Sequence, residues 1–320
     1  MRYTPPDFGS LAEMAAIDVG RLSEDRAREI LEAIRWPKGP ICPHCDGDNV
    51  TRLEGKSKKT RDGVIQCNEC RKQFTVTVGT VMHRSHITLR QWVQAFHSMC
   101  SHKKGVSALQ LQRNLGLHSY QAAWHLAHRI RFAMREEPLA DLLKGTVEVD
   151  ETYVGGKASG GKRGRGAPKK TIVVALVERD GRVKSKPVET ISATDLKGAI
   201  RENVDKTARI MTDELPSYRG IGTEFEGGHR TVNHGVGQYA TVGGVHVNGA
   251  ESYFALLKRG VHGTFHHVSK KHLFRYCDEF SFRWGERKVT DGERTVAAIK
   301  GMEGKRLTYK GTKHEQAETT

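Results

Sequence analysis

The sequence has little cysteine, no long apolar run and no excess of acidic residues. Six cysteines in 320 residues are too few for a secreted scaffold held together by disulfides. The longest apolar run, Ile172 to Val177, is far shorter than the ~20 residues that a membrane-spanning helix needs. The segment from Met1 to Pro6 also lacks the apolar stretch of a secretory signal. These absences predict a cytoplasmic protein with no membrane partner.

Basic residues are abundant instead. Lys and Arg number 52 against 37 Asp and Glu, which gives a formal net charge of +15 and a pI near 9.6. A field of this sign attracts polyanions, and nucleic acid above all. Hydrophobic residues make up 37% of the chain, enough for one substantial core and smaller modules. The composition therefore favours a globular protein that binds nucleic acid.

Four of the cysteines have the spacing of a zinc ribbon, Cys42-x2-Cys45-x21-Cys67-x2-Cys70. Each C-x2-C turn directs two thiolates toward one point, and two such turns supply the tetrahedral sulfur set that zinc prefers. A disulfide pair or a redox C-x-x-C is the alternative, but a redox motif needs no second copy. We predict a zinc ribbon over residues 41–78. Its ion is structural, because four thiolates leave no open position for a substrate.

Helical patterns precede and follow the ribbon. A capping serine followed by acids and regularly spaced apolar residues predicts a helix within the N-terminal segment 1–40. Over residues 86–137 the pattern predicts a short helix, a break at Gly116 and a second, basic helix, which is typical of a helix-turn-helix module. A plain helical bundle has a similar pattern. We favour DNA contact by the second helix, through Arg129 and Arg131.

From residue 145 the hydrophobic period becomes that of strands. Three strands, a helix and a further strand follow in order, and helices come after them. The run 172–177 has the pattern of a strand covered on both faces. This order indicates a mixed α/β domain over residues 145–290. The remaining segment, 291–320, is polar, and we predict a mobile tail with little to bury.

Three carboxylates occupy positions where this α/β domain can build a metal site. Asp150 lies on the first strand, Asp213 ends a later strand, and Glu251 lies on a following helix. Asn248 and Lys258 fall on the same side of that helix as Glu251. Each carboxylate alone is more typical of a solvated charge. Together they match phosphoryl transfer on DNA, which requires hard oxygen ligands for two Mg²⁺ ions roughly 3.5–4 Å apart.

A basic, glycine-rich loop joins the first two strands of this domain. Its sequence Gly156-x4-Gly161-Lys162 approaches a phosphate-binding loop, but Arg163 replaces the hydroxyl residue that such a loop needs. We therefore predict no nucleotide cofactor. The loop is better interpreted as a clamp on the DNA backbone, with a merely solvated loop as the alternative. Its candidate DNA contacts are Lys162, Arg163, Arg165, Lys169 and Lys170.

Several motifs together resemble one known family. They are the ribbon, the stretch 147–156 (VEVDETYVGG), Thr212-Asp213-Glu214 and the run 246–252 (HVNGAES). In combination they resemble the zinc-ribbon branch of the DDE-type bacterial insertion-sequence transposases, over nearly the whole chain from about residue 20 to about residue 285. The resemblance implies that the α/β domain is a ribonuclease-H-like catalytic domain.

The resemblance also implies roles for individual residues. It makes Asp150 and Asp213 the first two ligands of the catalytic Mg²⁺ or Mn²⁺ ions, makes Glu251 the third, and places Lys258 near the DNA terminus. Parts of this branch have asparagine at the third position, so Asn248 is the alternative. We prefer Glu251, because a carboxylate is the better ligand for a hard cation. The adjacent acids are interpreted as companions of these ligands: Glu148, Glu151 and Glu214.

The activity that the resemblance implies is transposition. The protein would bind the terminal inverted repeats of an insertion sequence, then cut and rejoin double-stranded DNA by two-metal chemistry. It would act as a homo-oligomer, because two element ends must be joined. A non-catalytic regulator built from the ribbon and the helix-turn-helix module is the alternative from another class. A stand-alone nuclease of the same fold is a third interpretation.

Overall fold

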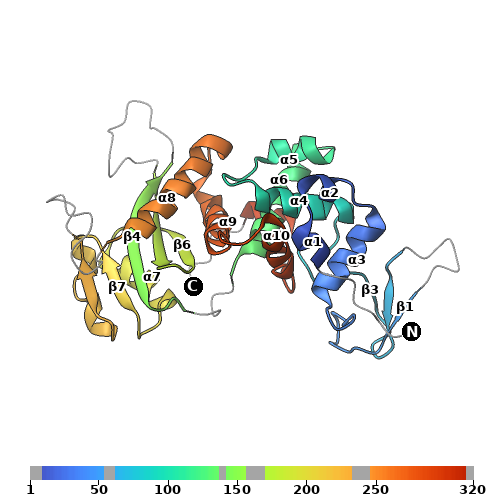
Figure 1. The fold of residues 1–320 in the computed structure, drawn as a ribbon, viewed down its shortest axis with the longest axis horizontal. Helices are drawn as coiled ribbons and strands as arrows, with labels where there is room; N and C mark the ends of the chain where they lie inside the picture. The colour runs from blue at the N-terminus through green and yellow to red at the C-terminus, as the bar shows by residue number, and fades with distance from the viewer. Residues whose placement is uncertain (1–8, 54–61, 137–141, 156–169, 233–245, 315–320) are drawn as a thin grey trace. The chain divides into compact units, whose positions relative to one another are not determined.

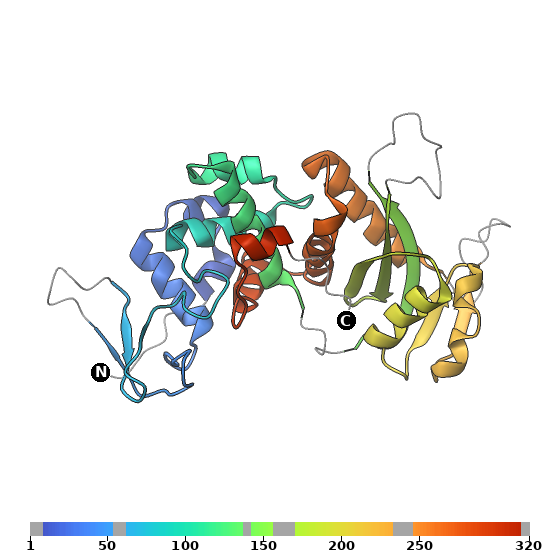
Figure 2. The same cartoon turned by 180° about the vertical axis from the view of Figure 1, so that it is seen from behind.

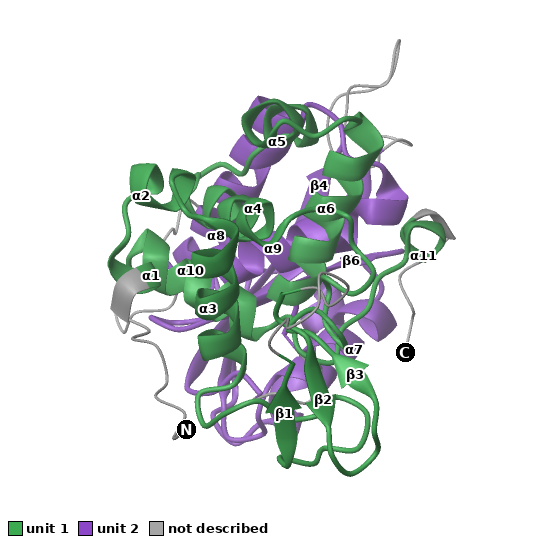
Figure 3. Cartoon of the chain, turned by 90° about the vertical axis from the view of Figure 1, so that its right-hand side faces the viewer, with its two compact units in different colours: residues 1–134, 288–314 green, residues 135–287, 315–320 purple. Residues whose placement is uncertain are grey.

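The computed structural model describes residues 9–53, 62–136, 142–155, 170–232 and 246–314. The chain forms two compact units, which Figure 3 shows in different colours. Unit 1 consists of residues 1–134 and 288–314, and unit 2 consists of residues 135–287 and 315–320. Among the described residues, no helix is both long and apolar enough to cross a membrane.

Unit 1 combines a small sheet with a group of helices. Its elements in chain order are α1 (Gly9–Glu13), α2 (Ala16–Gly20), α3 (Glu24–Arg35), β1 (Val50–Arg52), β2 (Ile65–Cys67), β3 (Gln73–Phe74), α4 (Leu89–Ser101), α5 (Ala108–Leu115), α6 (Tyr120–Met134), α10 (Asp291–Lys300) and α11 (Tyr309–His314). Strands β1, β2 and β3 form an antiparallel sheet in that order. This sheet contacts the end of α3, because the rings of Trp36 and Phe74 pack edge to face with centroids 5.8 Å apart.

Local side chains set the boundaries of the helices in unit 1. The hydroxyl of Ser23 accepts a hydrogen bond from the Arg26 amide and caps α3, as the sequence predicts. Thr88 begins α4 through a capping box, and Ser107 caps α5. At the end of α5, Gly116 adopts a left-handed conformation with φ of 63°, which favours glycine. The predicted break at Gly116 is therefore confirmed.

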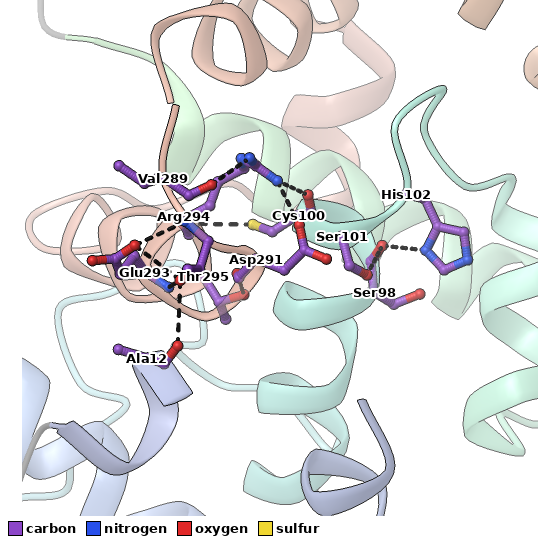
Figure 4. Close-up of polar contacts among 11 residues, drawn as sticks. Ala12, Ser98, Cys100, Ser101, His102, Val289, Asp291, Glu293, Arg294 and Thr295 are labelled. Carbon is purple, nitrogen blue, oxygen red and sulfur yellow. Dashed lines mark hydrogen bonds and ion pairs between the residues drawn. The ribbon is translucent and has the colours of Figure 1, made fainter. Parts of the chain in front are cut away.

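The C-terminal segment is not a polar tail. Helix α10 packs against α1, α3 and α4, and its Ala298 and Ile299 side chains are fully buried. Figure 4 shows how it is attached to α4: the guanidinium group of Arg294 donates to the carbonyl oxygen of Cys100 at 3.0 Å. The prediction of a mobile tail is wrong for residues 291–314. The apolar face of α10 is too narrow to stand out in the sequence, but it completes the core of unit 1.

Unit 2 is a five-stranded mixed sheet with helices on both faces, visible in Figures 1 and 2. Its elements are β4 (Thr146–Val154), β5 (Thr171–Glu178), β6 (Val183–Val188), α7 (Ala193–Asn203), β7 (Arg209–Thr212), η1 (Pro216–Tyr218), η2 (Ile221–Glu224), β8 (His229–Thr231), α8 (Asn248–Gly260), η4 (Val261–Phe265), η5 (Lys270–His272) and α9 (Leu273–Gly285). The strand order is β6-β5-β4-β7-β8. Strands β4, β5 and β6 are antiparallel neighbours, whereas β7 and β8 run parallel to β4.

Successive side chains of β4 and β5 point to opposite faces of the sheet, so the sheet has one hydrophobic core on each face. Val147 and Val149 of β4 face α7, together with Val174 of β5. The side chains on the other face of β5, which include Val173 and Ala175, pack against α8 and α9. Strand β5 is thus covered on both faces, as its apolar run predicts. The predicted mixed sheet with flanking helices is confirmed, and its central strand β4 carries Asp150.

Candidate functional site

The four predicted zinc ligands converge in unit 1. One sulfur atom from each of Cys42, Cys45, Cys67 and Cys70 lies within 4.8 Å of the others. The Sγ atoms of Cys42 and Cys70 are 3.7 Å apart, and those of Cys45 and Cys67 are 3.6 Å apart. A tetrahedral zinc ion with Zn–S bonds of ~2.3 Å has sulfur atoms about 3.8 Å apart. The cluster therefore fits a zinc ribbon.

The backbone around the cysteines is that of two equivalent knuckles. Asp46 and Arg71, each directly after the second cysteine of its pair, adopt left-handed conformations with φ of 58° and 60°. These turns direct backbone amides toward the sulfur atoms. The amide of Cys70, aided by that of Glu69, lowers the pKa of Cys67 to about 7. Burial raises the pKa of Cys42, and the pKa of Cys45 is also raised, despite the amide of Gly47. A thiolate is the form that binds zinc, so a bound ion would have to displace protons from these two thiols.

A second cluster, of carboxylates, lies in unit 2. Oxygen atoms of Asp150, Glu151 and Asp213 lie within 4.8 Å of one another. The parallel pairing of β4 with β7 brings this about, because Val149 lies opposite Thr212, the last residue of β7, and the residue that follows each of them is an aspartate. The predicted convergence of Asp150 with Asp213 is thus observed. We refer to these three residues as the acidic cluster.

Hydrogen bonds orient each carboxylate of the acidic cluster. Asp150 accepts from the amide of Glu151 at 2.8 Å, and Asp213 accepts from the amide of Leu215 at 3.0 Å. The buried hydroxyl of Tyr218 donates to Glu151 at 3.0 Å. These donors leave other oxygen atoms of Asp150 and Asp213 available as ligands, and carboxylate oxygens suit Mg²⁺ and Mn²⁺.

The surroundings of the acidic cluster oppose ionisation of Asp150. In the part of the chain that the structure describes, no lysine or arginine forms an ion pair with Asp150 or Asp213. Burial, followed by repulsion from Glu151 and other acids, raises the pKa of Asp150 from 3.8 to about 7. A bound divalent cation would reverse this effect, because it stabilises the ionised form.

Metal binding at Asp150 should therefore depend on pH. Below about pH 7 a cation must displace a proton from this carboxyl group, so Mn²⁺ affinity should rise by up to about tenfold per pH unit and then level off. Without metal, the contribution of Asp150 to the free energy of unfolding changes with pH in the opposite direction to the metal affinity. The folded state holds this proton more tightly than the unfolded chain, so the stability contribution falls as pH rises from 3.8 to about 7. Calorimetric Mn²⁺ titrations between about pH 6 and about pH 8 check this. An affinity that does not change with pH would contradict it.

The predicted third ligand lies outside the acidic cluster. Glu251 is exposed on α8, and its carboxylate is not among the three that converge. Its charge nevertheless contributes to the raised pKa of Asp150, which places it in the same neighbourhood. Asn248 is the exposed first residue of α8, and Lys258 is half-buried further along it. Helix α8 contacts β4, the strand of Asp150.

Sequence reasoning did not identify Glu151 as a member of the cluster. Strict alternation along a strand places Glu151 on the opposite face from Asp150, and the sequence indicates only a companion of the ligands at this position. Both carboxylates, in the middle of β4, nevertheless reach Asp213. The available signal is the pair of consecutive acids in the middle of a largely buried strand.

Of the predicted DNA-contacting cations, two are buried and most of the others lie outside the described residues. Arg129 and Arg131 are 5% and 2% exposed within unit 1, which corrects their assignment to a DNA-facing surface. The guanidinium group of Arg129 donates to the carbonyl oxygen of His83 at 2.8 Å and lies over the ring of Trp92. Lys170 is half-buried beside the start of β5. The other loop cations lie outside the described residues: Lys162, Arg163, Arg165 and Lys169.

The two clusters give the two units different kinds of candidate metal site. A tetrathiolate site in one unit and a carboxylate cluster on a mixed sheet in the other give the chain one structural and one candidate catalytic metal site. Comparison with known proteins agrees with this division. Residues 22–73 match the family described as a transposase zinc-ribbon domain, and residues 142–285 match the ISXO2-like transposase domain.

One relative of known sequence is also a protein of a transposable element. The chain is 28% identical over 277 residues to an uncharacterized protein in transposable element ISH50 of Halobacterium salinarum. The aligned region covers 82% of this chain and 91% of that protein. No solved structure matches. The two matched regions are therefore a transposase zinc ribbon and, after it, a DDE-type transposase domain of insertion sequences.

Proposed function

We propose that this protein binds the terminal inverted repeats of its own insertion sequence and catalyses metal-dependent cleavage and strand transfer. The acidic cluster carries the proposal, because it gathers three carboxylates where the middle of β4 lies beside the end of β7 within the matched transposase domain. The strand order, with three antiparallel and two parallel strands, supports a ribonuclease-H-like fold. The reaction would take place in the cytoplasm, on double-stranded DNA.

The chemistry assigned to the acidic cluster is two-metal phosphoryl transfer. Asp150 and Asp213 would hold Mg²⁺ or Mn²⁺, with Glu251 of α8 as a further ligand and Glu151 beside them. Bound ions would activate water for attack on the phosphodiester at the element end, and then the freed 3′ hydroxyl for attack on target DNA. Joining two ends requires two copies of the site, so the working form would be a homo-oligomer.

DNA recognition is assigned to unit 1. The pair α5 and α6, separated by the turn at Gly116, supports a helix-turn-helix module. The second half of α6 is buried, whereas Tyr120 and Gln121 at its start are exposed. Recognition helices contact base edges through their first residues, so these two side chains replace Arg129 and Arg131 as the proposed base contacts. Arg113 of α5 is exposed, and we assign it a phosphate contact.

Replacing Gln121 with Ala should weaken binding to the terminal repeat by about 1–3 kcal/mol, because one base contact is lost. Binding to a random duplex of equal length should stay nearly unchanged, since that binding depends on phosphate contacts. Fluorescence anisotropy with both duplexes measures the two affinities. An equal loss on both duplexes would refute a base contact by Gln121.

Incubation of the protein with a labelled terminal repeat, a target plasmid and Mn²⁺ separates the three candidate functions. A transposase cuts at the repeat and joins the new 3′ end to the target. A stand-alone nuclease cuts without joining, and a non-catalytic regulator binds without cutting. We expect joined products whose formation requires the divalent ion.

A further inference from the structure

Glu148 is buried beneath the start of α8. Its side chain is 1% exposed, and it lies on β4 two residues before Asp150, on the same face of the strand. Such complete burial of a carboxylate is costly unless its oxygen atoms are fully paired. The partners of Glu148 therefore indicate what it does.

One oxygen of Glu148 caps a helix that is about 100 residues away in the sequence. Its Oε2 accepts from the amide of Gly249 at 2.7 Å and from the amide of Ala250 at 3.3 Å. Val247, at the N-cap position of α8, provides no side-chain cap. The first turn of α8 thus obtains from β4 the acceptor that helices usually obtain from a neighbouring residue.

The other oxygen connects Glu148 to two basic side chains. Its Oε1 accepts from Nε of Arg179 at 2.8 Å and lies 3.1 Å from Nδ1 of His246. Arg179 in turn donates to the carbonyl oxygen of His246 at 3.1 Å, just before α8. The same carboxylate therefore fixes both the approach to α8 and its first turn.

Glycine at position 249 permits this close approach. A Cβ atom there would lie 2.7 Å from Oε2 of Glu148 and 3.3 Å from Val177 of β5. A methyl group would therefore have to displace the carboxylate or the helix. The start of α8 is seated directly on β4 and β5.

We propose that Glu148 is a positioning residue that sets α8 relative to Asp150. It would hold Asn248 and Glu251 at a fixed height above the acidic cluster without touching the metal ions or the DNA. The catalytic part of this inference rests on the proposed function, whereas the anchoring of α8 does not. It assigns a specific role to an acid that the sequence identified only as a companion of the ligands.

Hydrogen exchange of the full-length protein tests the anchoring. Glu148→Gln removes the negative charge of the group that accepts hydrogen bonds from the amides of Gly249 and Ala250. Amide hydrogen exchange at the start of α8 should therefore accelerate about 10- to 100-fold, while the amides of β5 keep their protection. Glu189→Gln is the matched control, because Glu189 is exposed and pairs with Lys270 at 2.7 Å. It should leave α8 unchanged.

Gly249→Ala provides a second variant that keeps the charge of Glu148. Alanine ordinarily favours a helix over glycine, so a merely local effect would slow exchange in α8. Displacement from Glu148 predicts faster exchange instead. Unchanged or slower exchange in this variant, together with unchanged exchange in Glu148→Gln, would overturn the anchoring.

Cleavage assays test the positioning role. At saturating Mn²⁺, both variants should cleave the terminal repeat about 10- to 100-fold more slowly, with melting temperatures of unit 2 close to that of the unsubstituted protein. Faster exchange with normal cleavage would overturn the positioning role. If the unsubstituted protein does not cleave DNA at all, the proposed function fails, but the exchange result still decides whether Glu148 anchors α8.

Discussion

Replacement of Asp150 by asparagine is expected to abolish both cleavage and strand transfer, by ~10³-fold or more. Asp150 lies at the centre of the acidic cluster, and its amide analogue offers no negative charge to a divalent ion. Asp213→Asn should have an equally large effect, because the two carboxylates share the ions. Binding to the terminal repeat should persist, since recognition of the repeat is assigned to unit 1 and neither aspartate is a proposed DNA contact. Gel assays with labelled repeats measure cutting, joining and binding in one experiment.

Glu214→Gln is the matched control for these variants. Glu214 directly follows Asp213 but is exposed and outside the acidic cluster, so its loss should leave cleavage nearly intact. Glu251→Gln should cause a large loss and Asn248→Ala a smaller one. The reverse ranking would assign the third position to Asn248. Full cleavage by Asp150→Asn would refute the catalytic site.

Removal of zinc is expected to unfold the ribbon while unit 2 stays folded. Structural zinc sites in small domains contribute ~10–16 kcal/mol of apparent binding free energy, and a three-stranded sheet of this size has little else to hold it. All four ligands lie between residues 42 and 70, whereas unit 2 has cores of its own. Chelation followed by hydrogen exchange should show loss of protection over residues 41–76 only. Specific DNA binding should fall with it.

Single cysteine variants separate the metal from general packing. Cys45→Ser removes a ligand and should reduce zinc content and ribbon protection together. Cys100→Ala is the control, because Cys100 is buried among helices and does not belong to the ligand set. It should retain zinc. A ribbon that stays protected without zinc would show that the four thiols have another role.

Local patterns in the sequence were sufficient to predict much of the fold. The cysteine spacing specifies the ribbon because each pair of ligands lies in one turn. Alternation of polar and apolar residues predicts β4, and the continuous apolar run predicts the fully covered β5. The meeting of Asp150 with Asp213 is predicted instead by their positions on a first and a later strand, taken together with the resemblance to the DDE-type transposases.

Features that depend on distant contacts could not be predicted in this way. The residues that cover α10 come from α1, α3 and α4, and its own sequence is mostly polar. The basic residue Arg129 resembles a DNA contact until its carbonyl and aromatic partners are known. The partners of Glu148 include two backbone amides, and a backbone amide has no signature in the sequence.

The most direct test of the account locates the metal ions themselves. Crystals of the protein grown with Mn²⁺ and a terminal-repeat duplex should give two anomalous scattering peaks, roughly 3.5–4 Å apart, that contact carboxylate oxygens of Asp150 and Asp213. Asp150→Asn crystals should lose at least one of them. Manganese bound only elsewhere, with an acidic cluster that holds no ion beside the DNA, would contradict the central claim.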